Sequence, residues 1–285
     1  MPHLNIWEAQ DALRRQLSAV SNSAYLDAQV LLASIIDKPR AWVIAYPEHK
    51  LEPSQVESLH RVLDRLESGE PMPYILGQWE FYGLDFIVTP AVLIPRPETE
   101  LLVDYALNWL RANPDHRRAA DVGTGSGCIA IALAANISDL TVVASDISMA
   151  ALDVARHNIA QHRQEERIHL VQADLLSTVS PSPDKKFDLV CANLPYIPQG
   201  TLDILDRLRW EPETALSGGE SGTEFIQRLL AVVPLCLNPG GLLLLEIEAS
   251  QGALVRGLAQ EMLTTSIVSL ERDLAGHDRL VVVHT

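Results

Sequence analysis

The sequence has 285 residues, of which 47% are hydrophobic and 21% charged, and its 22 Lys and Arg stand against 37 Asp and Glu, a formal net charge of −15. This composition is typical of a chain that folds around a core, and the length allows one large domain or a large domain with a small one. The acidic balance has the wrong sign for a protein that holds nucleic acid through its phosphates, so a nucleic-acid partner is disfavoured.

Residues 1–75 predict a small helical bundle, because their apolar residues recur at helical spacing. The helical segments lie at about 6–17, 25–35 and 56–66. Pro53 stands where a helix begins and Gly69 where one ends.

Residues 76–95 predict a β-hairpin linker, because aromatic and β-branched residues flank Gly83 in WEFYGLDFIVT. The next stretch, LIPRPETELLV, indicates a loop that runs into the start of a helix. On sequence alone, helix capping is sufficient to explain residues 96–100.

Residues 96–285 predict a second, larger domain, in which alternating apolar strands and helices are typical of a doubly wound α/β sheet. A terminal antiparallel hairpin, formed by the region of residues 267–270 and the segment after Leu274, is expected to complete the sheet. The other expected strands are 119–122, 141–145, 168–172, 187–192 and 242–247, and the expected helices are 128–136, 148–162, 223–237 and 251–263.

A glycine-rich loop, DVGTGSGCIA, joins the first of these strands to the first helix. Glycine permits positive φ and lets a ligand approach the backbone, and the helix N-terminus offers unpaired N–H groups. The dinucleotide fingerprint would need a third glycine where Cys128 stands, whereas the spacing here is similar to the S-adenosylmethionine loop of class I methyltransferases. The cofactor-binding residues expected in this loop are Gly123, Thr124, Gly125, Ser126 and Gly127.

Acidic residues end the second and third strands, at the edge where open α/β sheets bind ligands. Asp146 can accept both hydroxyls of a ribose, a feature that nicotinamide dehydrogenases share, so that class stays open as an alternative. Asp174 suits an adenine amino group, and Leu175 is expected to pack on the adenine ring.

The stretch CANLPYIPQG places Asn193, Leu194, Pro195 and Tyr196 at the tip of a strand expected beside the glycine loop. An amide nitrogen is a poor nucleophile because its lone pair is delocalised, so a catalyst must position it. The Asn193 side-chain oxygen and the Leu194 carbonyl can hold both N–H bonds, Pro195 stiffens the turn, and Tyr196 offers a flat face. This scheme needs no general base and no metal. An ordinary strand-to-loop exit is the alternative.

Several classes of protein are disfavoured by what the sequence lacks. Charged residues interrupt the first twenty positions, and no apolar run reaches the roughly 18 residues of a membrane span, so the cytoplasm is the expected compartment. Cys128, Cys191 and Cys236 are far apart and form no Cys-x-x-Cys pair, which argues against both a disulfide framework and a zinc site.

From about Glu70 to the C-terminus the chain resembles the HemK/PrmC family, on the segments IPRPETE, DVGTGSGCIA, FDLVCANLPYIP and EPETALSGGESG. These enzymes methylate N5 of the glutamine in the Gly-Gly-Gln motif of class I peptide chain release factors. The resemblance implies a class I S-adenosylmethionine-dependent methyltransferase with a Rossmann-like seven-stranded sheet, a product S-adenosylhomocysteine, a helical domain that binds the release factor, and a monomer.

By this resemblance Gly123 to Gly127, Asp146, Leu175 and Asn193 contact the cofactor, and residues 193–196 hold the glutamine. The chain departs from the family at Leu194, where proline is usual, and at Leu175, where an aromatic residue is common.

Two further alternatives remain open on the sequence. Enzymes that methylate amino groups of DNA adenine or rRNA guanine use the same two loops, but such a protein is expected to carry a basic surface. A noncatalytic module that only binds the cofactor would not depend on Asn193.

Overall fold

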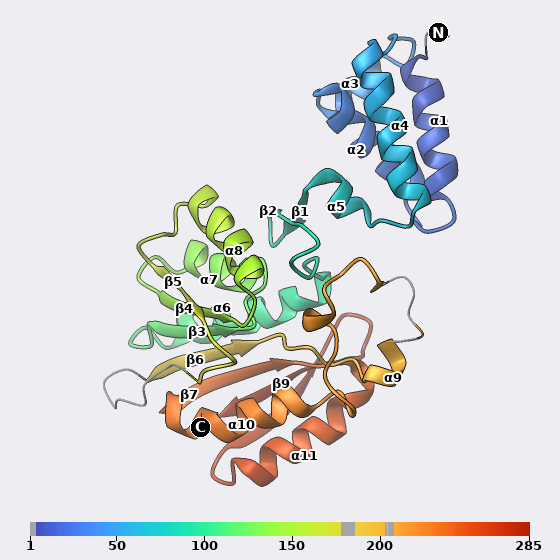
Figure 1. Cartoon of the computed structure of the whole chain (residues 1–285). Helices are drawn as coiled ribbons and strands as arrows, with labels where there is room; N and C mark the ends of the chain where they lie inside the picture. The colour runs from blue at the N-terminus through green and yellow to red at the C-terminus, as the bar shows by residue number, and fades with distance from the viewer. Residues whose placement is uncertain (1–3, 178–185, 203, 205–207) are drawn as a thin grey trace. The chain divides into compact units, whose positions relative to one another are not determined.

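In the computed structural model (Figure 1), which describes residues 4–177, 186–202, 204 and 208–285, the chain divides after Gly77 into two compact units. No helix within these residues has both the length and the apolar character needed to cross a membrane. All residues of the candidate site described below belong to the second unit, which begins at Gln78.

The first unit is the helical domain expected from the sequence. Asn5 and Glu8 form a reciprocal capping box at its first helix, and Pro53 occupies the first turn of its fourth, so the polar ends of both helices are satisfied locally. The two short helices were missed because each is only one or two turns long and follows a proline. The helices are α1 (Ile6–Leu17), α2 (Ala24–Ile36), α3 (Arg40–Ala45), α4 (Pro53–Glu67) and α5 (Met72–Leu76).

The second unit opens with a two-stranded antiparallel hairpin, β1 (Gln78–Phe81) and β2 (Leu84–Ile87). Both residues of its turn, Tyr82 and Gly83, have positive φ, as a two-residue type I′ turn requires. The chain then passes through a 3₁₀ turn, η1 (Pro97–Thr99), into helix α6 (Glu100–Ala112).

A seven-stranded sheet with strand order β5-β4-β3-β6-β7-β9-β8 forms the centre of this unit. The first five strands of this order are parallel, and β9 lies antiparallel to both of its neighbours, so the expected Rossmann-like sheet with a terminal hairpin is confirmed. The strands are β3 (Arg118–Val122), β4 (Thr141–Asp146), β5 (Ile168–Gln172), β6 (Phe187–Ala192), β7 (Leu237–Glu246), β8 (Ile267–Arg272) and β9 (Asp278–His284).

Helices cover both faces of the sheet (Figure 1). Helices α6, α7 (Cys128–Asn136) and α8 (Met149–Gln161) pack on one face, and α10 (Glu224–Cys236) and α11 (Gly252–Met262) on the other. Alternate residues of each strand enter one core or the other. Leu189 and Cys191 of β6 face the α6 side, for example, together with Leu242 and Leu244 of β7.

Strand β7 begins five residues earlier than expected, at Leu237 instead of Leu242. The sequence Asn-Pro-Gly-Gly at 238–241 indicates a turn, and the structure accommodates it as an irregularity in the strand. The register against β6 jumps there, since Phe187 pairs with Leu237 and Leu189 with Leu242. Helix α10 therefore runs into β7 without a separate loop.

Candidate active site

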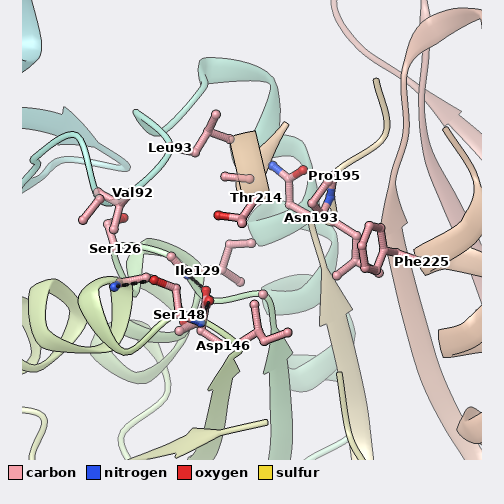
Figure 2. Close-up of a pocket in the computed structure, with 18 of the residues that line it drawn as sticks. Val92, Leu93, Ser126, Ile129, Asp146, Ser148, Asn193, Pro195, Thr214 and Phe225 are labelled. Atoms are coloured by element: carbon pink, nitrogen blue, oxygen red, sulfur yellow. Dashed lines mark hydrogen bonds between the residues drawn. The ribbon is translucent and has the colours of Figure 1, made fainter. Parts of the chain in front are cut away.

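A cavity of about 430 Å³ lies at the carboxyl ends of the parallel strands. In Figure 2, Asn193, Pro195 and Phe225 lie on one side of it, and Ser126, Asp146 and Ser148 on another. The walls come from the loop after the hairpin, the glycine loop, the ends of β4 and β6, and a segment near residue 215. The lining residues from the loop after the hairpin are Ala91, Val92, Leu93, Pro95, Arg96 and Thr99.

The glycine loop has the backbone that its sequence predicted. Gly123, Gly125 and Gly127 all have positive φ, of 73°, 55° and 82°. A side chain at Gly125 would meet no atom within 4 Å, so this part of the loop presents bare backbone to open space. A ligand can therefore approach the peptide groups closely.

Asp121, which was not predicted as a site residue from the sequence, stabilises this loop through hydrogen bonds. It is fully buried, and its Oδ2 accepts hydrogen bonds from Thr124 Oγ1 at 2.6 Å and from the Ala130 amide at 3.2 Å. Burial raises the pKa of this carboxyl to about 6, while both hydrogen bonds favour its ionised form. The signal in the sequence was an acid at the end of an apolar strand, directly before the loop.

Asp146 ends β4 and lines the cavity. Its Oδ2 accepts from the Gly125 amide and its Oδ1 from the Ser148 amide, both at 2.9 Å. Burial raises its pKa above the ordinary aspartate value. Each carboxylate oxygen has two lone pairs, so after these bonds each can still accept from a ligand hydroxyl.

Asp174 and Leu175 also line the cavity. Asp174 forms an ion pair of 2.5 Å with Arg228, whose guanidinium lies 5.6 Å from the ring centre of Phe225. Leu175 has a φ of 55°, a backbone conformation that leucine rarely adopts and that often marks a functional constraint. Phe225, which the sequence analysis missed, gives this wall of the cavity an aromatic ring.

The Asn193 loop follows β6, the strand next to β3, as expected. The Asn193 carboxamide donates from Nδ2 to Thr99 Oγ1 at 3.1 Å. Leu194 and Pro195 line the cavity, and no hydrogen bond to the Leu194 carbonyl is found in the described part of the chain. Tyr196 is half-buried and is not among the cavity residues, so its stacking role stays a prediction.

A second segment, residues 216–219, fixes the path of this loop. The Ile197 amide donates to the Leu216 carbonyl at 3.0 Å, and the Gly218 amide donates to the Ile197 carbonyl at 2.8 Å. A side-chain carbon at Gly218 would lie 2.7 Å from the Pro195 carbonyl oxygen. The paired glycines in SGGESG are the signal that could have indicated this close approach of two backbones.

Residues 96–99 do more than cap a helix. Thr99 makes no capping hydrogen bond to α6, and its hydroxyl accepts from Asn193 instead. Arg96 forms an ion pair with the buried Glu211, which also accepts from the Ile94 amide at 3.2 Å. This segment therefore connects three parts of the cavity wall.

Solved methyltransferases share this fold. The methyltransferase from Pyrococcus furiosus is 20% identical, with a TM-score of 0.52 over 72% of this chain and 89% of the other. The catalytic domain of hMettl16, solved with a MAT2A 3′UTR hairpin, is 16% identical, with a TM-score of 0.56 over 82% of each chain. At these identities the likeness concerns the fold alone.

The sheet, the glycine loop and the cavity define a class I methyltransferase, and residues 99–220 match the methyltransferase small domain. Residues 8–77 match the PrmC N-terminal domain. The release factor glutamine methyltransferase of Coxiella burnetii is 38% identical over 98% of both chains, and that of Vibrio cholerae is 38% identical over 92% of this chain and 90% of its own. The chain belongs to the release factor glutamine methyltransferase family.

Proposed function

We propose that this protein transfers a methyl group from S-adenosylmethionine to the side-chain amide nitrogen, N5, of the glutamine in the Gly-Gly-Gln motif of class I peptide chain release factors. The names of its full-length relatives support this substrate. One structural observation carries the proposal: the Asn193 carboxamide, with its nitrogen held by Thr99, lies in a cavity that also contains the glycine loop.

The residues of the cavity fit S-adenosylmethionine. The volume lies within the roughly 300–1,000 Å³ usual for small-molecule sites. Bare backbone at Gly125 leaves room for the amino-acid part, Asp146 can accept the ribose hydroxyls, and Asp174 the adenine amino group. Leu175 and Phe225 offer apolar faces for the adenine ring. When bound, this cofactor supplies an electrophilic methyl group.

The residues of this chain position the glutamine amide and do not remove its proton. The Asn193 oxygen and the Leu194 carbonyl accept the two N–H bonds of the glutamine amide, which directs the nitrogen lone pair toward the methyl group. Burial raises the pKa of Tyr196 to about 12, so its hydroxyl stays protonated at neutral pH and does not serve as a base. The proton leaves after positive charge has developed on the nitrogen.

The first unit is proposed to bind the release factor. Its surface includes large exposed apolar side chains, among them Trp7, Tyr25, Ile44 and Tyr46. A monomeric state, the cytoplasm as the compartment, and the absence of a metal and of direct nucleic-acid binding stay predictions.

The substrate is tested by offering the chain a release factor, DNA and rRNA separately with labelled cofactor, followed by mass spectrometry of the release factor peptides. We expect the mass of the Gly-Gly-Gln glutamine to rise by about 14 Da, because one hydrogen is replaced by a methyl group. We expect no added mass on a release factor in which that glutamine is alanine. Label found only on nucleic acid would contradict the proposal and support the amino-methylating alternative.

Asp146→Asn is expected to weaken cofactor binding by roughly 10–100-fold, because a hydrogen bond to a charged group contributes about 1.5–3 kcal/mol. In the wild type the Gly125 and Ser148 amides both donate to the Asp146 carboxylate oxygens. In the variant the NH₂ group of the carboxamide faces one of these two amides, and two donors then meet. Calorimetric titration with S-adenosylhomocysteine measures the change. The control is Asp153→Asn, the same substitution at an exposed position on α8. Equal affinities for S-adenosylhomocysteine in both variants would show that Asp146 does not bind the cofactor.

A further inference from the structure

Glu246, the last residue of β7, is the starting point of a further inference. It is only 2% exposed, and its Oε2 is buried with no hydrogen-bond partner among the described residues. An isolated buried carboxylate is costly, so such a group calls for a physical explanation. The proposed methyl transfer does not use it directly, because Glu246 does not line the cavity.

The register of the sheet places Glu246 beside Asn193. Cys191 of β6 pairs with Leu244 of β7, and both side chains face the α6 side of the sheet. Because side chains alternate along a strand, the next residues on that face are Asn193 and Glu246. Thr99, at the start of α6, lies over the same face and is also 2% exposed.

The hydrogen bond between Asn193 and Thr99 shows which end of the Asn193 carboxamide faces the protein interior. Asn193 Nδ2 donates to Thr99 Oγ1 at 3.1 Å, and both side chains lie close enough to the Glu246 carboxyl to lower its pKa. An ionised carboxylate can only accept, so it requires donors from its neighbours. The nitrogen end of the carboxamide therefore turns toward Thr99 and Glu246, and the oxygen is the end left for a ligand.

We propose that Glu246, acting partly through Thr99, is a positioning residue that fixes which end of the Asn193 carboxamide is offered to the substrate. The two ends of a carboxamide have nearly the same shape, so packing alone does not choose between them. Only the oxygen end can accept an N–H of the glutamine amide. The inference rests on the proposed function and extends it to a residue outside the cavity.

Protonation of Glu246 is expected to remove this selection, because a neutral carboxyl can donate as well as accept. Burial raises the pKa of Glu246 to about 7, while the nearby Thr99 and Asn193 side chains and the charge of Arg279 on β9 lower it. Glu98 raises it further, and Tyr196 and Cys128 also lie within its field. The ionised, orienting form therefore predominates above about pH 7.

Glu246→Gln is expected to lower kcat about tenfold at pH 8, with the KM for the cofactor changed less than twofold. The step in kcat near pH 7 should disappear, while any step from Asp121, whose pKa is about 6, should persist. Glu261→Gln, the same substitution at an exposed position of α11, is the control. Equal kcat and pH profiles in the two variants would overturn the inference.

Two further variants test the hydroxyl of Thr99. Thr99→Val removes the hydroxyl that accepts from Asn193, whereas Thr99→Ser keeps it. The serine variant is expected to turn over at least about fivefold faster than the valine variant. Equal loss in both would indicate packing and not hydrogen bonding, against the inference.

Side-chain NMR tests the orientation without any substrate. The Asn193 NH₂ signals, assigned by their absence in Asn193→Ala, are expected to shift with a midpoint near pH 7 in the wild type and not in Glu246→Gln. Signals that ignore pH in both proteins would overturn the inference. If the wild type methylates no release factor, the proposed function fails, but this measurement still decides the role of Glu246.

Unfolding measurements separate positioning from a structural role. The pKa of Glu246 in the folded chain, about 7, lies above the ordinary value of 4.5, so folding favours the protonated form. This group therefore lowers the free energy of unfolding as the pH rises from about 4.5 to 7. Glu246→Gln lacks that loss and is expected to be at least as stable as the wild type at pH 8. A large destabilisation there would indicate a structural role instead.

Discussion

Asn193→Ala is expected to lower kcat about a thousandfold, equivalent to about 4 kcal/mol of transition-state stabilisation. In the proposed mechanism the alanine removes one of the two acceptors of the glutamine amide, and it also leaves the Thr99 hydroxyl without its donor. Cofactor affinity should fall less than about tenfold, because the glycine loop and Asp146 are untouched. Single-turnover methyl transfer and calorimetric titration measure the two effects separately.

The matched control for this variant is Asn136→Ala. Asn136 is exposed at the end of α7, and among the described residues its side chain donates only to the Ala132 carbonyl one turn earlier. It should retain wild-type kcat. Full turnover by Asn193→Ala would reject the mechanism and favour a module that binds the cofactor without catalysis.

Gly218→Ala is expected to lower kcat about a hundredfold, although Gly218 contacts no ligand in the proposed mechanism. Its added carbon would lie 2.7 Å from the Pro195 carbonyl oxygen and 2.8 Å from the Tyr196 Cα. Backbone atoms cannot give way as a flexible side chain can, so the Asn193 loop must shift. A displacement of about 1 Å at a catalytic group typically costs about a hundredfold in rate.

Gly200→Ala provides the control, because a carbon there meets no atom within 4 Å and Gly200 does not have positive φ. The same backbone entropy is removed from the unfolded chain in both variants. Thermal unfolding should find both folded. If Gly218→Ala is folded and has wild-type kcat, the spacing between the two segments does not set the geometry of the site.

The backbone of the glycine loop could be predicted because it depends on local sequence. Gly123, Gly125 and Gly127 follow a strand and precede a helix. Each position has positive φ, and glycine is the residue that adopts this conformation without steric cost. The position of Asp146 at the edge of the cavity was predictable for a similar reason, since the carboxyl ends of parallel strands meet at one edge.

Contacts between distant segments could not be predicted in this way. Thr99 and Asn193 are 94 residues apart, and their hydrogen bond depends on how α6 lies over the sheet. Glu246 meets Asn193 only because β7 pairs with β6 in a particular register, which resumes after an irregular stretch. Sequence spacing carries no information about either arrangement.

The structure also bears on the two departures from the family pattern. The leucine at 194 is buried, and its Cδ2 would lie 3.2 Å from a side-chain carbon at Gly123, so it packs against the glycine loop. Phe225 lines the cavity together with Leu175. An aromatic ring is thus present near Leu175, but it comes from α10 and not from the end of a strand.

Strand β9 has a consequence for how the protein is made. It lies between β7 and β8, and its Leu280 pairs with Glu246, although it is the last strand in the sequence. A ribosome delivers residues in order, so during synthesis β7 has an unpaired, strongly apolar edge until residues 278–284 emerge. Nascent chains that stop short of this strand are expected to aggregate or to bind chaperones, and they lack the neighbour that holds Glu246 in place.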